Sequence, residues 1–141
     1  MNIRILLAEA HTLMRESLRS LIDRQPGMEV VAEAEKGRTA LQLTCRLKPD
    51  VVVMDINMPD LKGIAAARRM ISDSPGVKIV ALSLYSNRQF VEKMFEAGAS
   101  GYLLKDRAFE ELVPAIRTVA GNRTYLSPGS DNTPLCSREA F

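Results

Sequence analysis

Short apolar runs alternate along the chain with segments whose apolar residues recur every three or four positions. A short continuous apolar run bounded by turn residues is typical of a buried strand, and the longer spacing is typical of one helix face. The runs predict strands at 3–8, 29–34, 51–54, 77–82 and 101–104, of which the second is shorter and more polar. The helix-like spacing is carried by Met14, Leu18, Leu21 and Ile22, by Ala40, Leu43 and Leu47, by Ile64, Ala67 and Ile71, by Phe90, Val91, Met94 and Phe95, and by Phe109, Leu112, Val113, Ile116 and Val119.

Proline and glycine separate these segments. The first helix is expected to end at Pro26-Gly27, the second before Pro49, and the third near Ser74-Pro75-Gly76. Gly98 is expected to cap the fourth helix, and Gly121 stands just past the fifth.

Strands that alternate with helices predict a parallel sheet with helices on both faces. Five such units with right-handed crossovers favour a flavodoxin-like (βα)5 doubly wound sheet with strand order 2-1-3-4-5. The switch point then lies between strands one and three. Ligands bind at the carboxyl ends of such strands, where this chain carries Glu9 and Asp55.

The stretch Val51–Asp60 is the most informative part of the chain. Its apolar run reaches the carboxylate of Asp55 and breaks at Pro59. Taken alone, this stretch leaves two interpretations open, since Asp55 is either a cap for the following turn or a reactive carboxylate.

Composition narrows the class of protein. The chain has 141 residues, 46% of them hydrophobic and 26% charged, which is typical of one soluble domain with a real core. A net charge of +2 is too small to indicate nucleic-acid binding by this segment. No apolar run has the roughly 18 residues of a membrane span, and the run at 5–8 is too short for a signal peptide. We therefore expect a cytoplasmic protein.

Cysteine and histidine are scarce. Cys45 and Cys136 are far apart in the sequence, and His11 is the only histidine. This pattern argues against a zinc site and a Cys/His nucleophile pair, and favours reduced structural thiols. His11 follows the end of the first strand and is expected to be a surface residue.

The amino-acid composition of the chain changes after Leu126. Residues 127–134 are rich in Ser, Pro, Gly and Asn, which is typical of a linker, whereas 135–141 begin a new apolar, helix-like segment. We expect a domain at 1–126, a linker at 127–134, and at 135–141 the start of a truncated second domain.

Four pieces of the chain together resemble the receiver domain of bacterial two-component response regulators of the NarL/FixJ type, which carry a LuxR-like helix-turn-helix domain. They stand at the ends of strands one, three, four and five, and the resemblance covers roughly residues 3–126. Leu135-Cys136-Ser137-Arg138-Glu139 is similar to the beginning of the LuxR-type DNA-binding domain. The four pieces are Ile5-Leu6-Leu7-Ala8-Glu9-Ala10-His11, Asp55-Ile56-Asn57-Met58-Pro59-Asp60 with Gly63, Ile79-Val80-Ala81-Leu82-Ser83, and Ala97 to Asp106.

The resemblance implies a chemistry for the site. Asp55 would accept a phosphoryl group from a sensor histidine kinase, with Lys105 and Ser83 neutralising and hydrogen-bonding its oxygens. Mg²⁺ would be held by Glu9, by Asp55 and by the backbone carbonyl of Asn57. Ser83 and Tyr102 would act as the switch: Ser83 would move toward the phosphate and Tyr102 would turn inward, changing the surface of helix four, strand five and helix five. The output would be transcription regulation, with DNA bound only through the missing domain, and no membrane partner is expected.

One position departs from the family pattern. The first strand of a receiver usually ends in two acidic residues, of which the second contacts the metal directly, but here the pair is Glu9-Ala10. Two interpretations of this departure remain open, in addition to the explanation that the site is an engineered or natural variant. Either the longer Glu9 side chain keeps a weakened Mg²⁺ site, or this is a degenerate, phosphate-independent receiver that serves as a dimerisation or docking module.

Other functions fit less well. A haloacid-dehalogenase-like phosphatase needs a second aspartate two residues after its nucleophile, where this chain has Asn57, so we expect no enzyme of this class. A flavodoxin needs a Ser/Thr/Gly-rich phosphate loop after strand one, which is absent at 9–14. A homodimer is plausible through Leu13, Phe109 and Val113, although we expect each of these residues to lie in the core.

Overall fold

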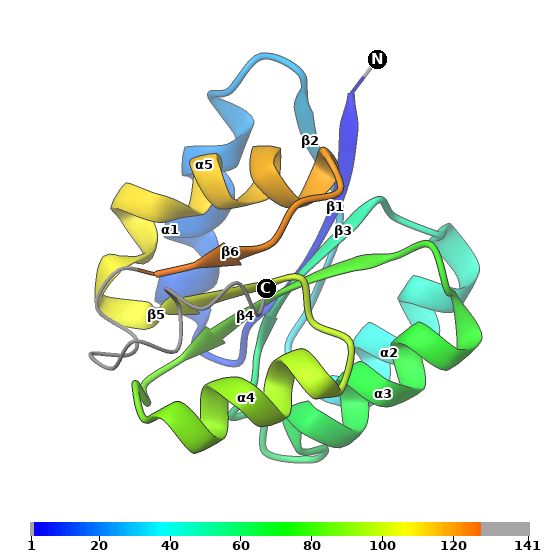
Figure 1. Cartoon of the computed structure of the whole chain (residues 1–141). Helices are drawn as coiled ribbons and strands as arrows, with labels where there is room; N and C mark the ends of the chain where they lie inside the picture. Colours follow the sequence, from blue (N-terminus) through cyan, green and yellow to red (C-terminus); the bar gives the residue numbers. More distant parts are fainter. Residues whose placement is uncertain (1, 128–141) are drawn as a thin grey trace.

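The computed structural model describes residues 2–127, which form a parallel six-stranded sheet between two layers of helices (Figure 1). The expected linker after Ser127 and the segment 135–141 lie outside the described residues. The elements in chain order are β1 (Ile3–Ala8), α1 (Thr12–Asp23), β2 (Met28–Ala34), α2 (Gly37–Leu47), β3 (Val51–Asp55), α3 (Gly63–Asp73), β4 (Lys78–Ser83), α4 (Arg88–Glu96), β5 (Gly101–Leu104), the 3₁₀ turn η1 (Lys105–Arg107), α5 (Ala108–Ala120) and β6 (Tyr125–Leu126).

The strand order is β2-β1-β3-β4-β5-β6, so the predicted order 2-1-3-4-5 is confirmed and extended by one strand. Strand β6 was not predicted, because two residues that pair beside Gly101 and Tyr102 carry too little periodicity to be recognised. Ser127, which we expected to begin the linker, is buried, and its N–H donates to the Tyr102 carbonyl at 2.9 Å.

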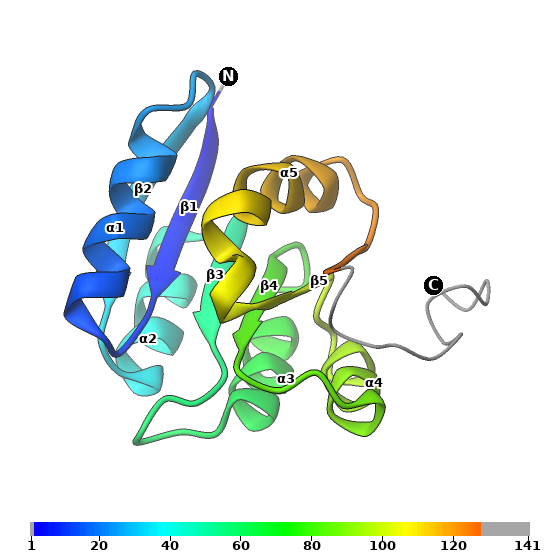
Figure 2. The same cartoon turned by 90° about the vertical axis from the view of Figure 1, so that its left-hand side faces the viewer.

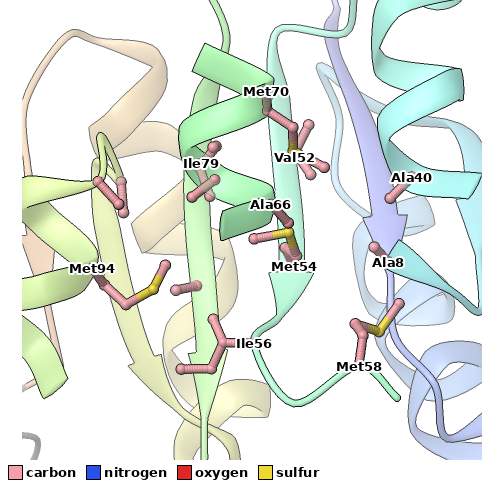
Figure 3. Close-up of a cluster of buried hydrophobic side chains, with 14 of the residues drawn as sticks. Ala8, Ala40, Val52, Met54, Ile56, Met58, Ala66, Met70, Ile79 and Met94 are labelled. Atoms are coloured by element: carbon pink, nitrogen blue, oxygen red, sulfur yellow. The ribbon is translucent and has the colours of Figure 1, made fainter. Parts of the chain in front are cut away.

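Each face of the sheet carries its own core. Helices α1 and α5 cover one face, and α2, α3 and α4 cover the other (Figures 1 and 2). Side chains alternate along β3: Val51 and Val53 pack toward α1 and α5, whereas Val52 and Met54 pack toward α2–α4 (Figure 3). Burial on both faces explains why this strand is apolar throughout until Asp55.

Three expectations about individual segments were wrong. Strand β2 has seven residues and is longer than β1: it begins one residue earlier than expected, where Met28 pairs with Ile3, and a register shift leaves Val31 as an extra residue. Leu13 and Phe109 are not core residues, since they are 77% and 53% exposed. Both residues occupy the outer side of a helix whose inner side is filled by other apolar residues, as periodicity alone does not say where an apolar stripe ends.

Within residues 2–127, no helix combines the length and the apolar character needed to cross a lipid bilayer.

The loop after β3 is held against α3 by the close approach of two backbones. The Gly63 N–H donates to the Ile56 carbonyl at 3.2 Å, and a Cβ on Gly63 would lie 2.6 Å from the Ile56 Cα. Only a residue without a side chain therefore fits where α3 begins.

We expect Gly63→Ala to lower the free energy of unfolding by about 1–3 kcal/mol, because the added methyl group overpacks a contact made partly by backbone. Urea denaturation followed by circular dichroism measures the change. Gly76→Ala is the matched control, since no atom lies within 4 Å of the position that a Cβ on Gly76 would take. Equal stability of the two variants would contradict the tight fit.

Candidate functional site

The ends of β1, β3 and β5 bring three charged side chains together at one edge of the sheet. Glu9 follows β1, Asp55 ends β3, and Lys105 begins the turn after β5. Glu9 and Asp55 are fully buried and Lys105 is 8% exposed. The Lys105 Nζ lies 2.9 Å from Asp55 Oδ2 and 3.4 Å from Glu9 Oε2, so one ammonium group faces two carboxylates.

The backbone of the following loop orients Asp55. Asp55 Oδ1 accepts a hydrogen bond from the Asn57 N–H at 2.8 Å, which leaves Oδ2 directed at Lys105. The chain therefore turns around the carboxylate, and Asp55 is both the cap of this turn and a buried carboxylate beside a cation. Of the predicted magnesium ligands, Glu9 and Asp55 are brought together, while Asn57 contacts Asp55 through its N–H.

Glu9 is fixed from two sides. Its N–H donates to the Ala34 carbonyl at 3.0 Å, and its carbonyl accepts from the Arg15 guanidinium at 2.9 Å. Its side-chain Oε2 accepts from the backbone N–H of His11 at 3.0 Å and lies 2.9 Å from the His11 Nδ1. The side chain of His11 is 72% exposed, as expected for a surface residue, but its contact with Glu9 was not foreseen.

A chain of hydrogen bonds joins Ser83 to Tyr102. The buried Ser83 Oγ accepts from the Tyr85 N–H at 2.9 Å, and the Tyr85 carbonyl accepts from the Tyr102 hydroxyl at 2.6 Å. Burial raises the pKa of the Tyr102 hydroxyl, although a hydrogen bond with Ser83 opposes the rise. The aromatic ring is fully buried, so the inward position that we expected to follow switching is the one this structure has.

Asp60 has a structural role near the site that was not predicted, since it was noted only as the last residue of the Asp55–Asp60 motif. Its carboxylate accepts hydrogen bonds from the N–H groups of Gly37 and Arg38, at 2.7 and 3.2 Å. Asp60 thus fastens the loop after Asp55 to the first turn of α2, where negative charge is favoured. A distant aspartate that serves the N-terminus of another helix leaves no local sequence signal.

The residues at this edge fit a divalent cation. Glu9 Oε1 is buried and has no hydrogen-bond partner among the described residues, which is costly unless a donor or a cation satisfies it. Ligand atoms of Glu9, His11 and Asp55 lie within 4.8 Å of one another. Carboxylate oxygens are the ligands that Mg²⁺ prefers. Ala10, in contrast, has no ligand atom in its side chain.

Residues 5–117 match the protein family described as response regulator receiver domain. The chain is 38% identical over 126 residues to the transcriptional regulatory protein DegU of Brevibacillus brevis, covering 89% of this chain and 53% of that protein. It is 36% identical, also over 126 residues, to the response regulator GacA of Pseudomonas aeruginosa, covering 89% of this chain and 59% of GacA. The chain thus spans little more than half the length of these curated relatives.

Two solved structures of response regulators have the same fold as this chain. The crystal structure of a LuxR-family two-component response regulator from Aurantimonas sp. SI85-9A1 superimposes with a TM-score of 0.86 at 39% identity, covering 91% of each chain. The receiver domain of the putative response regulator NarL from Mycobacterium tuberculosis superimposes with a TM-score of 0.82 at 30% identity, covering 86% of this chain and 98% of that one.

We expect Lys105→Met to lower the free energy of unfolding by about 3–5 kcal/mol, because it leaves two buried carboxylates without their cation. Lys36→Met is the matched control: Lys36 is exposed, and its loss should change stability by about 0.5 kcal/mol or less. Urea denaturation at neutral pH measures both. Similar values for the two variants would show that Lys105 is not held as a buried ion pair.

Proposed function

The chain belongs to the response regulator receiver domain family, and we propose that Asp55 is the residue on which it is phosphorylated. The family comprises signalling proteins of two-component systems, which work with sensor histidine kinases and often dimerise. The observation that carries the proposal is the 2.9 Å contact between Lys105 Nζ and Asp55 Oδ2 at the sheet edge where the ends of β1 and β3 meet.

In the proposed reaction, an oxygen of Asp55 attacks the phosphorus of a phosphohistidine on the kinase. The new P–O bond gives an acyl phosphate while the P–N bond breaks, and the imidazole of the kinase leaves and takes up a proton. Lys105 lies where its positive charge offsets the charge of the phosphoryl oxygens. Because Asp55 is fully buried, access of the donor to its carboxylate requires a local movement.

A divalent cation supplies further neutralisation of the phosphoryl oxygens when it is bound. Glu9 and Asp55 are the carboxylates that would hold it, together with the backbone carbonyl of Asn57. We propose that Mg²⁺ serves this purpose and that its binding is weakened, because Ala10 removes one carboxylate from the set.

The switch that we propose begins at Ser83. Its hydroxyl can donate to a phosphoryl oxygen on Asp55, and a movement of Ser83 pulls on the Tyr85 backbone through the 2.9 Å hydrogen bond. Tyr102 is joined to the same backbone through its hydroxyl. The change therefore reaches β5 and the surface formed with α4 and α5.

The relatives' names indicate transcription regulation as the output of the whole protein. We propose that DNA is bound by a separate domain and not by residues 2–127, whose fold is that of the receiver. A cytoplasmic location, where DNA is accessible, follows from that output. The exposed Leu13 and Phe109 are candidates for a homodimer contact.

The degenerate-receiver alternative gains no separate support. A receiver that had abandoned phosphorylation has no need to keep the carboxylate, the lysine and the hydroxyl together at one edge. Asp55, Lys105 and Ser83 are buried, and Lys105 is ion-paired with Asp55, which supports the phosphoacceptor proposal.

Incubation with acetyl phosphate and Mg²⁺ is expected to add one phosphoryl group, and Asp55→Asn should abolish the addition because it removes the nucleophile. Intact-mass spectrometry measures the product. Asp106→Asn is the matched control, since Asp106 is exposed and close in sequence to Lys105, and it should still be labelled. Labelling that persists in Asp55→Asn, or no labelling of the wild type at high Mg²⁺, would refute the proposal.

Ala10→Asp is expected to raise the affinity for Mg²⁺ on the order of tenfold, because divalent affinity rises with the number of carboxylate ligands. Isothermal titration calorimetry measures the change. Glu29→Ala is the control for a change of surface charge, since Glu29 is exposed and pairs with Arg4 at the opposite end of β1 from Glu9, and it should have no effect. If Ala10→Asp leaves the affinity unchanged, position 10 does not face the metal.

A further inference from the structure

A second kind of ligand atom lies beside the position where Ala10 offers none. His11 is the next residue in the chain, and its Nδ1 is 2.9 Å from Glu9 Oε2. Ligand atoms of His11, Glu9 and Asp55 lie within 4.8 Å of one another. The structure therefore gathers one imidazole and two carboxylates around one point, in place of carboxylates alone.

An independent observation, a buried carboxylate oxygen without a partner, supports a cation at this point. Glu9 is fully buried, and its Oε1 has no hydrogen-bond partner among residues 2–127. Lys105 is the ammonium group that faces both Glu9 and Asp55, so the carboxylates outnumber it. A buried oxygen without a donor, in a site with excess negative charge, is stabilised by a bound metal ion.

We propose that the His11 imidazole replaces the absent carboxylate as a metal ligand, so that the site selects a first-row transition cation such as Mn²⁺ over Mg²⁺. The proposal rests on the proposed function for the purpose of the metal: Mg²⁺ can serve Asp55 but binds weakly, and Mn²⁺ binds the same site more tightly. Imidazole nitrogen is a good ligand for first-row transition ions, whereas Mg²⁺ demands oxygen ligands and loses its water reluctantly.

The position of His11 suits this role. Its backbone N–H is fixed to Glu9 Oε2 at 3.0 Å, which keeps the residue at the site. Its ring, in contrast, is 72% exposed and has room to turn. Two ligands on opposite sides of an octahedral ion with bonds of about 2.1 Å are about 4.2 Å apart. The ligand atoms of the three groups, which lie within 4.8 Å of one another, are close to that span.

His11 has a simpler alternative role, which is to orient Glu9 by a hydrogen bond without touching a metal. The two roles differ in their dependence on the ion. A residue that only orients Glu9 would affect Mn²⁺ and Mg²⁺ equally, while a nitrogen ligand favours Mn²⁺ alone.

The experiment compares binding of Mn²⁺ alone and of Mg²⁺ alone to the full chain by isothermal titration calorimetry. Both cysteines are first replaced by serine, since thiols also bind transition ions and Cys45 is exposed. In this background we expect His11→Ala to weaken Mn²⁺ binding on the order of tenfold and to leave Mg²⁺ binding within about twofold. His11→Asp should reverse the preference by supplying an oxygen ligand.

Pulsed electron paramagnetic resonance of bound Mn²⁺ gives a second readout. A nitrogen hyperfine coupling is expected in the parent protein and should be lost in His11→Ala. Thermal unfolding followed by circular dichroism checks that the variant is folded, which we expect because the ring is exposed.

Three results would overturn the inference: no Mn²⁺ binding by the parent protein, an equal effect of His11→Ala on both ions, or no nitrogen coupling. Acetyl phosphate labelling of the same proteins separates this outcome from the proposed function. If Asp55 is labelled while His11→Ala leaves Mn²⁺ binding unchanged, only the inference about the metal fails and the proposed function stands. If Mn²⁺ binding needs His11 but Asp55 is never labelled with either ion, the phosphoacceptor role fails.

Discussion

The ion pair between Lys105 and Asp55 is the interaction on which the site depends. Both groups are buried, and burial of a charge is tolerated only when a partner of opposite charge is held close by. The two residues are 50 positions apart in the chain and meet because β3 and β5 end at the same edge of a parallel sheet, with β4 between them. The order of the strands therefore decides which side chains meet. Glu9 joins the pair for the same reason, and Ser83 ends the strand that lies between β3 and β5.

The sequence predicted the fold where local patterns are strong. Five strands, five helices and their order followed from apolar runs and glycine or proline stops, and the unbroken run Val51–Met54 correctly indicated burial on both faces of the sheet. Prediction from the sequence failed where a feature depends on a contact between distant residues, as with the hydrogen bonds of Asp60 to α2, or on a very short segment, as with β6. Phe109 fits a helical stripe but lies outside the core, as does Leu13, because the width of a buried face depends on what packs against it.

For the site, strand ends identified the charged residues but not their contacts. Glu9 and Asp55 were expected at one edge from the topology and Lys105 from the resemblance to receiver domains, and the structure brings them within ion-pair distance. The contact of His11 with Glu9 could not be predicted, because it depends on the turn that the backbone makes after β1. This contact matters for the proposed metal site, since Ala10, whose side chain has no ligand atom, is followed by a residue that offers a nitrogen.

A double-mutant cycle between Lys105 and Asp55 tests the central claim, which is that these two side chains act as one buried charge pair. The free energies of unfolding of Lys105→Met, Asp55→Asn and the double variant are measured by urea denaturation at neutral pH. The account predicts that the double variant is destabilised less than the sum of the single variants, with a coupling above about 1 kcal/mol, because Asp55→Asn removes a charge that Lys105→Met leaves unpaired. Additivity within about 0.5 kcal/mol would contradict it.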